Sequence, residues 1–102
     1  RGKKQMASNK FKSPQADKLF EAIMSLQSVD ECYDFFEDLC TVAEIHAMIQ
    51  RFEIALMLDE GKIYTTITDE TGASAATISR VHKCLNYGEN GYKRTIQRLK
   101  GK

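Results

Sequence analysis

The hydrophobic residues of this chain recur at the three- and four-residue spacing of amphipathic helices. Ser13 and Pro14 suit the N-cap and the first position of a helix. The apolar residues that follow lie mainly on one face: Leu19, Phe20, Ile23, Met24 and Leu26. No segment alternates apolar and polar residues for long enough to predict a strand, although residues 63–68 are rich in β-branched side chains. We predict an all-α chain of about six short helices.

Two capping boxes, Ser28 with Glu31 and Thr41 with Glu44, predict the next two helix starts. The first of these helices is apolar on more than one side, so we expect part of it to contact a partner chain. The second is the longest and should end near Gly61, since glycine takes a positive φ without a steric penalty. Its predicted apolar stripe is Ile45, Met48, Ile49, Phe52, Ala55, Leu56 and Leu58.

Residues 64–86 have the pattern of a helix-turn-helix. Gly72 would allow the tight bend after a short first helix, and Ser74 can cap the second helix. The small residues around the turn let the two helices pack at a steep angle and let the second enter a DNA groove. The predicted core shared by the two helices is Ile67, Ala73, Ile78 and Val81.

A recognition helix in this place would turn its N-terminal residues toward base edges. The alanines and the threonine methyl suit thymine methyl groups, Arg80 suits guanine or phosphate, and Lys83 suits phosphate. We expect Tyr64, Thr65 and Thr66, which open the preceding helix, to contact the DNA backbone. An ordinary αα-hairpin packed by alanine is the alternative. The predicted reading surface is Ser74, Ala75, Ala76, Thr77, Ser79, Arg80 and Lys83.

Length and charge favour a binding role. A helical domain of 102 residues leaves little room for a deep active-site cavity. The net charge of +1 conceals segregation: residues 1–20 carry +5, residues 21–70 carry −10 and residues 71–102 carry +6. Basic ends around an acidic middle are what a nucleic-acid footprint on a repelling body would produce, although solvated helix faces would give the same counts.

The start of the chain predicts no structure. Residues 1–12 are expected to be a flexible basic tail, part of which could derive from an expression vector, and residues 13–102 the helical DNA-binding domain. No apolar run approaches the roughly 20 residues that cross a bilayer, and no signal-peptide-like segment follows the basic start. We therefore expect a soluble, cytoplasmic protein.

No residue pattern predicts catalysis or a cofactor. Cys32, Cys40 and Cys84 form no CxxC pair, which argues against a disulfide framework or a zinc finger and favours reduced thiols. His46 is predicted on a helix surface, and His82, beside a lysine, is expected to face solvent or the DNA backbone. Paired nucleophile and base, metal-ligand spacing and a glycine-rich phosphate loop are all missing from the sequence, so we expect neither an enzyme nor a metal protein.

About residues 39 to 86 resemble the bacterial Trp repressors. The most specific part of the match is Thr71-Gly-Ala-Ser-Ala-Ala-Thr-Ile-Ser-Arg80; Leu39-Cys-Thr41, Arg51 and the stretch 58–61 also match. Similarity to the YerC/YecD-type Trp-repressor-like regulators extends over residues 31–39 and 84–88. The resemblance implies an intertwined all-α homodimer whose two recognition helices enter successive major grooves of a palindromic operator.

Trp repressors bind L-tryptophan as corepressor, and this chain departs from their ligand site. A family glycine beside the indole is Val81 here, whose branched side chain would crowd a planar ring. A family serine that helps to hold the amino group is Cys84, a poorer hydrogen-bond partner. We therefore expect no response to L-tryptophan; another small effector, or none, stays open. The positions resembling the effector pocket are Thr41, Arg51, Thr77, Arg80 and Cys84.

We also expect Arg51 to be structural, because an arginine in an acidic helix usually pairs with a carboxylate.

The sequence predicts a DNA-binding transcriptional regulator, a repressor that forms a homodimer on double-stranded DNA. Two alternatives remain open. One is a helical dimeric protein-interaction module without DNA binding, and the other is an architectural protein that binds duplex DNA with weak sequence preference.

Overall fold

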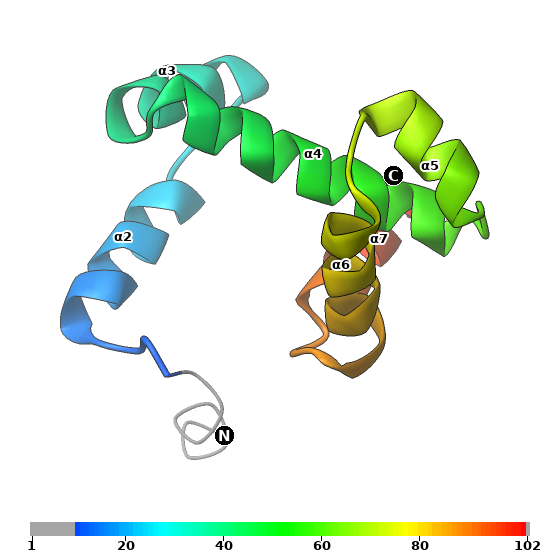
Figure 1. The fold of residues 1–102 in the computed structure, drawn as a ribbon. Helices are drawn as coiled ribbons and strands as arrows, with labels where there is room; N and C mark the ends of the chain where they lie inside the picture. The colour runs from blue at the N-terminus through cyan, green and yellow to red at the C-terminus, as the bar shows by residue number, and fades with distance from the viewer. Residues whose placement is uncertain (1–9, 102) are drawn as a thin grey trace. The chain divides into compact units, whose positions relative to one another are not determined.

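The computed structural model describes residues 10–101 and contains six helices and no strand in that range (Figure 1). The helices are α2 (Pro14–Met24), α3 (Val29–Leu39), α4 (Val42–Asp59), α5 (Tyr64–Thr71), α6 (Ala75–Tyr87) and α7 (Gly91–Lys100). The predicted all-α class is confirmed. Most of the predicted tail, residues 1–9, lies outside the described residues. No helix between residues 10 and 101 is long and apolar enough to cross a membrane.

The chain divides after Thr41 into two compact units, which we describe separately. In the N-terminal unit, α2 and α3 begin where their caps were predicted. The Ser13 hydroxyl accepts the backbone N–H of Ala16 at 3.0 Å, and the Ser28 hydroxyl accepts that of Glu31 at 3.1 Å. The Glu31 carboxylate accepts the backbone N–H of Gln27 at 3.0 Å, the residue before the N-cap.

The helices of the N-terminal unit have no buried residue. Two helices of 11 residues each can pair some aromatic rings, and Phe35 and Phe36 lie edge to face with centroids 5.6 Å apart. Much apolar surface is nevertheless open to solvent, including Met24 at 84% and Tyr33 at 70% exposure. Phe11, at the end of the predicted tail, places its ring 6.3 Å from that of Phe20 on α2.

The C-terminal unit contains the core. Helices α5, α6 and α7 all contact α4, and the predicted helix-turn-helix core is buried as expected. The α4 stripe was partly wrong: Ile54 and Met57, which it left out, are buried, whereas Met48 and Ile49 are exposed. The exposed residues lie in the first half of α4, while the buried ones lie in the second half. The buried residues are Ile54, Ala55, Met57, Ile67, Ala73, Ile78, Val81, Leu85 and Ile96.

The end of α4 follows the prediction. Gly61 has a φ of +85°, its N–H donates to the Leu58 carbonyl at 3.0 Å, and the N–H of Lys62 donates to the Met57 carbonyl at 3.1 Å. These bonds satisfy carbonyls that the helix leaves without partners at its C-terminus. The chain thereby leaves α4 in the direction that lets α5 start at Tyr64.

Candidate nucleic-acid interface

The turn between α5 and α6 is held by glycine and by one threonine hydroxyl. Gly72 has a φ of +76°, and its N–H donates to the Thr68 carbonyl at 2.8 Å. The Thr71 hydroxyl donates to the Ile67 carbonyl at 2.7 Å and accepts the N–H of Ala73 at 3.1 Å. From α4, the side-chain amide of Gln50 donates to the Thr71 carbonyl at 3.1 Å. The turn is therefore fixed both locally and from the long helix behind it.

Helix α6 is anchored at its start and along one face. The Ser74 hydroxyl accepts the backbone N–H of Thr77 at 3.2 Å, as predicted for the N-cap. Ile78, Val81 and Leu85 follow at helical spacing and are all buried. Burial of this row fixes the rotation of α6 about its axis, so the residues on its other sides point in defined directions.

Most of the predicted reading surface is open to solvent. The half-buried members of the DNA-binding set are Thr66 and Thr77. Every other member is exposed: Tyr64, Thr65, Ser74, Ala75, Ala76, Ser79, Arg80 and Lys83. The structure therefore brings the predicted residues of α6 to the surface of one helix, opposite and beside its buried row.

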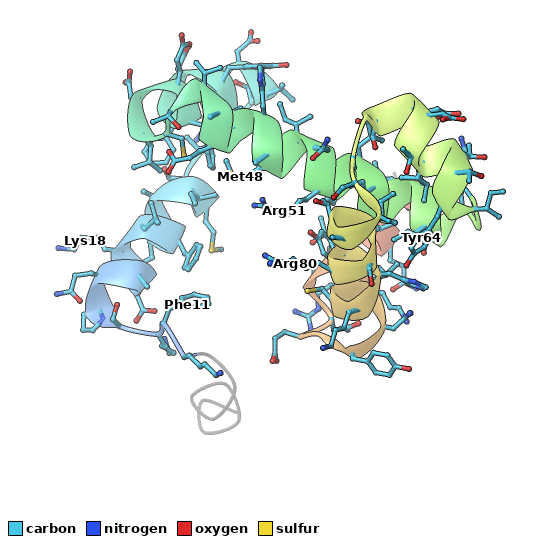
Figure 2. All side chains as sticks on the ribbon, in the orientation of Figure 1. Phe11, Lys18, Met48, Arg51, Tyr64 and Arg80 are labelled. Atoms are coloured by element: carbon cyan, nitrogen blue, oxygen red, sulfur yellow. The ribbon has the colours of Figure 1, made fainter. Side chains whose placement is uncertain are left out.

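The residues of α6 outside its buried row form two flanks, because successive residues turn by about 100°. Thr77, Arg80 and Cys84 form one row, and Ala75, Ser79 and His82 form the other. Figure 2 shows that Arg80 of α6 and Arg51 of α4 lie on one side of α6, with Tyr64 on the other side. Four of the five predicted effector residues thus lie toward one flank of α6, while Thr41 ends the N-terminal unit.

The cations at this surface have no carboxylate partner. Among residues 10–101, Arg51, Arg80 and Lys83 make no ion pair, whereas Lys62 lies within 4 Å of two carboxylates. The expectation that Arg51 pairs with an acidic neighbour was wrong. The positions three and four residues away on α4 are alanine, methionine and isoleucine, so no carboxylate is within reach on the same helix face.

Tyr64 and His82 form a contact that the sequence did not reveal. The Tyr64 hydroxyl lies 3.0 Å from Nδ1 of His82, and the two rings meet edge to face with centroids 6.0 Å apart. The contact joins the first residue of α5 to α6, 18 residues further along. The spacing of residues along the chain does not reveal such a pair, because the contact depends on how the turn sets the two helices against each other.

The remaining candidate residues add no chemical centre. Cys32, Cys40 and Cys84 are free thiols; Cys40 is half-buried and the other two are exposed. Between residues 10 and 101 no three histidine, cysteine or carboxylate side chains gather as a metal site would require. His46 lies exposed on α4, as predicted.

Comparison with known proteins identifies the fold. The family described as Trp repressor protein matches residues 14–100. This chain belongs to the Trp repressor family. It is 50% identical over 95 residues to the uncharacterized protein YerC of Bacillus subtilis, a match that covers 93% of this chain and 91% of that protein.

Two solved structures of the family have the same fold. A TrpR-like protein from Eubacterium eligens is 54% identical, with a TM-score of 0.86 over 90% of this chain and 95% of the other. A proposed Trp repressor from Staphylococcus aureus is 45% identical, with a TM-score of 0.86 over 89% and 91% of the two chains. The resemblance predicted from the sequence is therefore confirmed, and Trp repressor family membership indicates a helix-turn-helix DNA-binding regulator.

Proposed function

We propose that this Trp repressor family member is a sequence-specific transcriptional regulator, a cytoplasmic repressor that binds a palindromic operator through α5 and α6. One observation supports this most strongly. Helix α6 is fixed by its buried row, while its opposite side combines small exposed residues with the unpaired cations Arg80 and Lys83. Small side chains let a helix approach base edges closely, and unpaired cations suit the phosphates beside them.

Each part of the surface has a proposed role. Ala75, Ala76 and Ser79 would face base edges in the major groove, because they lie on the first turns of the recognition helix. Lys83 would hold a phosphate, while Arg80 would bond guanine or phosphate. The start of α5, including Thr65 and Thr66, would lie along the DNA backbone.

We propose that a second copy of the chain covers the apolar surface of the N-terminal unit. Its helices bury no residue within one chain, and exposed patches of this kind mark interaction sites. A dimer would also present two recognition helices to the two halves of a palindrome. Sedimentation should show a dimer, and Met24→Asp should shift it toward monomer. Unchanged sedimentation for this variant would contradict cover of Met24 by the partner.

We infer that the regulator does not use L-tryptophan. Val81 is 1% exposed, so its side chain fills space at the position where the resemblance expects a glycine. A small effector, if one is used, would bind on the Arg51 side of α6. The two unpaired guanidinium groups, Arg51 and Arg80, would suit an anionic group there.

The test is selection from a random-sequence duplex library with the purified protein at moderate salt, followed by titration of the enriched duplex with and without L-tryptophan. We expect a palindrome, and no effect of tryptophan. Ala76→Glu should weaken binding by at least about tenfold, because it places a carboxylate against the DNA. Thr95→Glu, an equally exposed change on α7, is the matched control and should bind like the parent.

Three other outcomes would contradict parts of the proposal. No enrichment above the starting library, together with binding of a basic protein partner that weakens as salt is raised, would favour the interaction module. The exposed carboxylates of α3 suit such a partner. Equal affinity for enriched and random duplexes would favour architectural binding. Tighter binding with tryptophan would show that Val81 leaves room for the indole.

A further inference from the structure

The Tyr64–His82 contact lies at the edge of the proposed DNA surface, outside the core. Tyr64 is 37% exposed and His82 is half-buried, so both residues remain in contact with solvent. A hydrogen bond between two such groups contributes little to stability, since water would satisfy either group equally well. Its effect is to orient the imidazole ring. His82 lies on the same row of α6 as Ala75 and Ser79, two residues proposed to read DNA.

The hydrogen bond links the direction of donation to the tautomer of a neutral imidazole. The Tyr64 hydroxyl either donates to an unprotonated Nδ1 or accepts from Nδ1–H, because a phenol oxygen can do both. When Tyr64 donates, the ring proton is on Nε2, at the far side of the ring from Tyr64. Among residues 10–101, no group accepts a hydrogen bond from Nε2.

We propose that His82 donates its Nε2–H to a DNA phosphate, and that Tyr64 is the positioning residue that holds the ring and its proton for this contact. The inference rests on the proposed function and adds a residue that the predicted reading surface lacks. It also changes the role of Tyr64, which acts through His82 and does not touch DNA itself. Lys83, the next residue, would bind a neighbouring phosphate.

DNA binding should then be linked to protonation, because histidine changes its charge between pH 5 and 8. A protonated His82 would add a positive charge at the phosphate. Tyr64 from α5 is the titratable group in contact with it, Lys83 is the next residue on α6, and the positions three and four residues away on α6 carry no charge. Helices α4 and α7 contribute no hydrogen bond or ion pair to His82 within the described residues. Phosphate is therefore the group that would favour the protonated form.

The experiment measures the affinity of the full chain for a mixed-sequence 20-base-pair duplex at pH 8 and pH 6, each over a range of KCl concentrations. Binding should be about tenfold tighter at pH 6, because a charged hydrogen bond replaces a neutral one. The slope of log K against log salt should steepen by about 0.9 for each His82 engaged. His82→Gln keeps an amide donor without titrating and should lose both changes, whereas His46→Gln on α4 should keep them.

Tyr64→Phe separates positioning from a purely structural role. At pH 8 the variant should bind about threefold more weakly, because Nδ1 and Nε2 then share the proton. At pH 6 the deficit should vanish, since an imidazolium donates from both nitrogens whatever Tyr64 does. The same deficit at both pH values would overturn the positioning role.

Nitrogen NMR of His82 gives a readout that does not need DNA. The Nε2–H tautomer is expected for the parent and a mixture for Tyr64→Phe; an Nδ1–H tautomer in the parent would overturn the inference. So would His82→Gln retaining the pH and salt dependence of the parent. If the parent chain fails to bind the duplex even at low salt, the proposed function itself is wrong. Loss of binding on Ala76→Glu with no effect of His82→Gln would leave the proposed function standing without the His82 contact.

Discussion

Val81 should be one of the residues on which the stability of the C-terminal unit depends most. Its side chain is 1% exposed and shares the core with Ile78 and Leu85 on the inner row of α6. Val81→Gly removes three buried carbons, which costs about 2.4 kcal/mol at about 0.8 kcal/mol per carbon. Glycine inside a helix adds about 0.3–0.5 kcal/mol relative to valine, because valine itself has a lower helix propensity than alanine. We therefore expect a loss of about 3 kcal/mol or slightly more, including any cavity that does not close.

A matched pair of variants separates these contributions. Val81→Ala removes two carbons, which costs about 1.6 kcal/mol, and recovers about 0.6 kcal/mol of helix propensity. We therefore expect a loss of about 1 kcal/mol, plus the cost of any cavity that does not close. Ser79→Gly, on the exposed side of the same helix, should cost only about 0.5 kcal/mol because it changes propensity without changing the core. Urea unfolding followed by circular dichroism gives the free energies, at one fixed protein concentration because association contributes to the stability of a dimer. If Val81→Gly costs no more than Ser79→Gly, the side chain does not pack as described.

Three further changes test the turn, the cap and the ion pair. Gly72→Ala should destabilise the chain by about 1–2 kcal/mol in urea unfolding. An added methyl group would meet nothing within 4 Å, so the cost is that of placing alanine in a left-handed backbone conformation. A stabilised variant would refute this. Ser74→Ala should cost about 1 kcal/mol, because the N–H of Thr77 loses its acceptor; a loss below about 0.3 kcal/mol would show that water replaces the cap. The Asp59 carboxylate raises the pKa of Lys100 through a 2.6 Å hydrogen bond and through its charge. The pair therefore stabilises the fold below the ordinary lysine pKa, and this stabilisation is lost as the pH rises through the raised pKa. Asp59→Asn should therefore lower the Tm at pH 8 and match the parent once the pH exceeds the raised pKa of Lys100. Equal melting curves at both pH values would exclude a contribution from the pair.

Helix boundaries could be predicted because their signals are local. Ser13, Ser28 and Ser74 each bond a backbone N–H three residues ahead, and the two glycines with positive φ, Gly61 and Gly72, end helices at their own positions. Such contacts are decided within a few residues, so they are visible in the sequence. The core around Ile78 could also be predicted, because the turn leaves the two helices few ways to pack.

Features that depend on distant neighbours could not be predicted. The apolar stripe of α4 has the same periodicity throughout, yet its second half is buried and its first half includes exposed Met48 and Ile49, because α5, α6 and α7 contact only part of it. Arg51 lacks a carboxylate because the helix face it shares has none, which a count of acidic residues does not reveal. The candidate site was predicted by residue, but the contact of Tyr64 with His82 needed the three-dimensional arrangement.

The arrangement of α6 has a consequence for evolutionary divergence. Its stability comes from one side of the helix, and its proposed contacts with DNA come from the others. Exchanges at Ala75, Ala76 or Ser79 would therefore change which bases are preferred at a cost of about 0.5 kcal/mol or less in stability. Related regulators could acquire new target sites by substitutions at a few surface positions, without compensating changes in the core. The same separation makes α6 a suitable place to redesign operator preference in the laboratory.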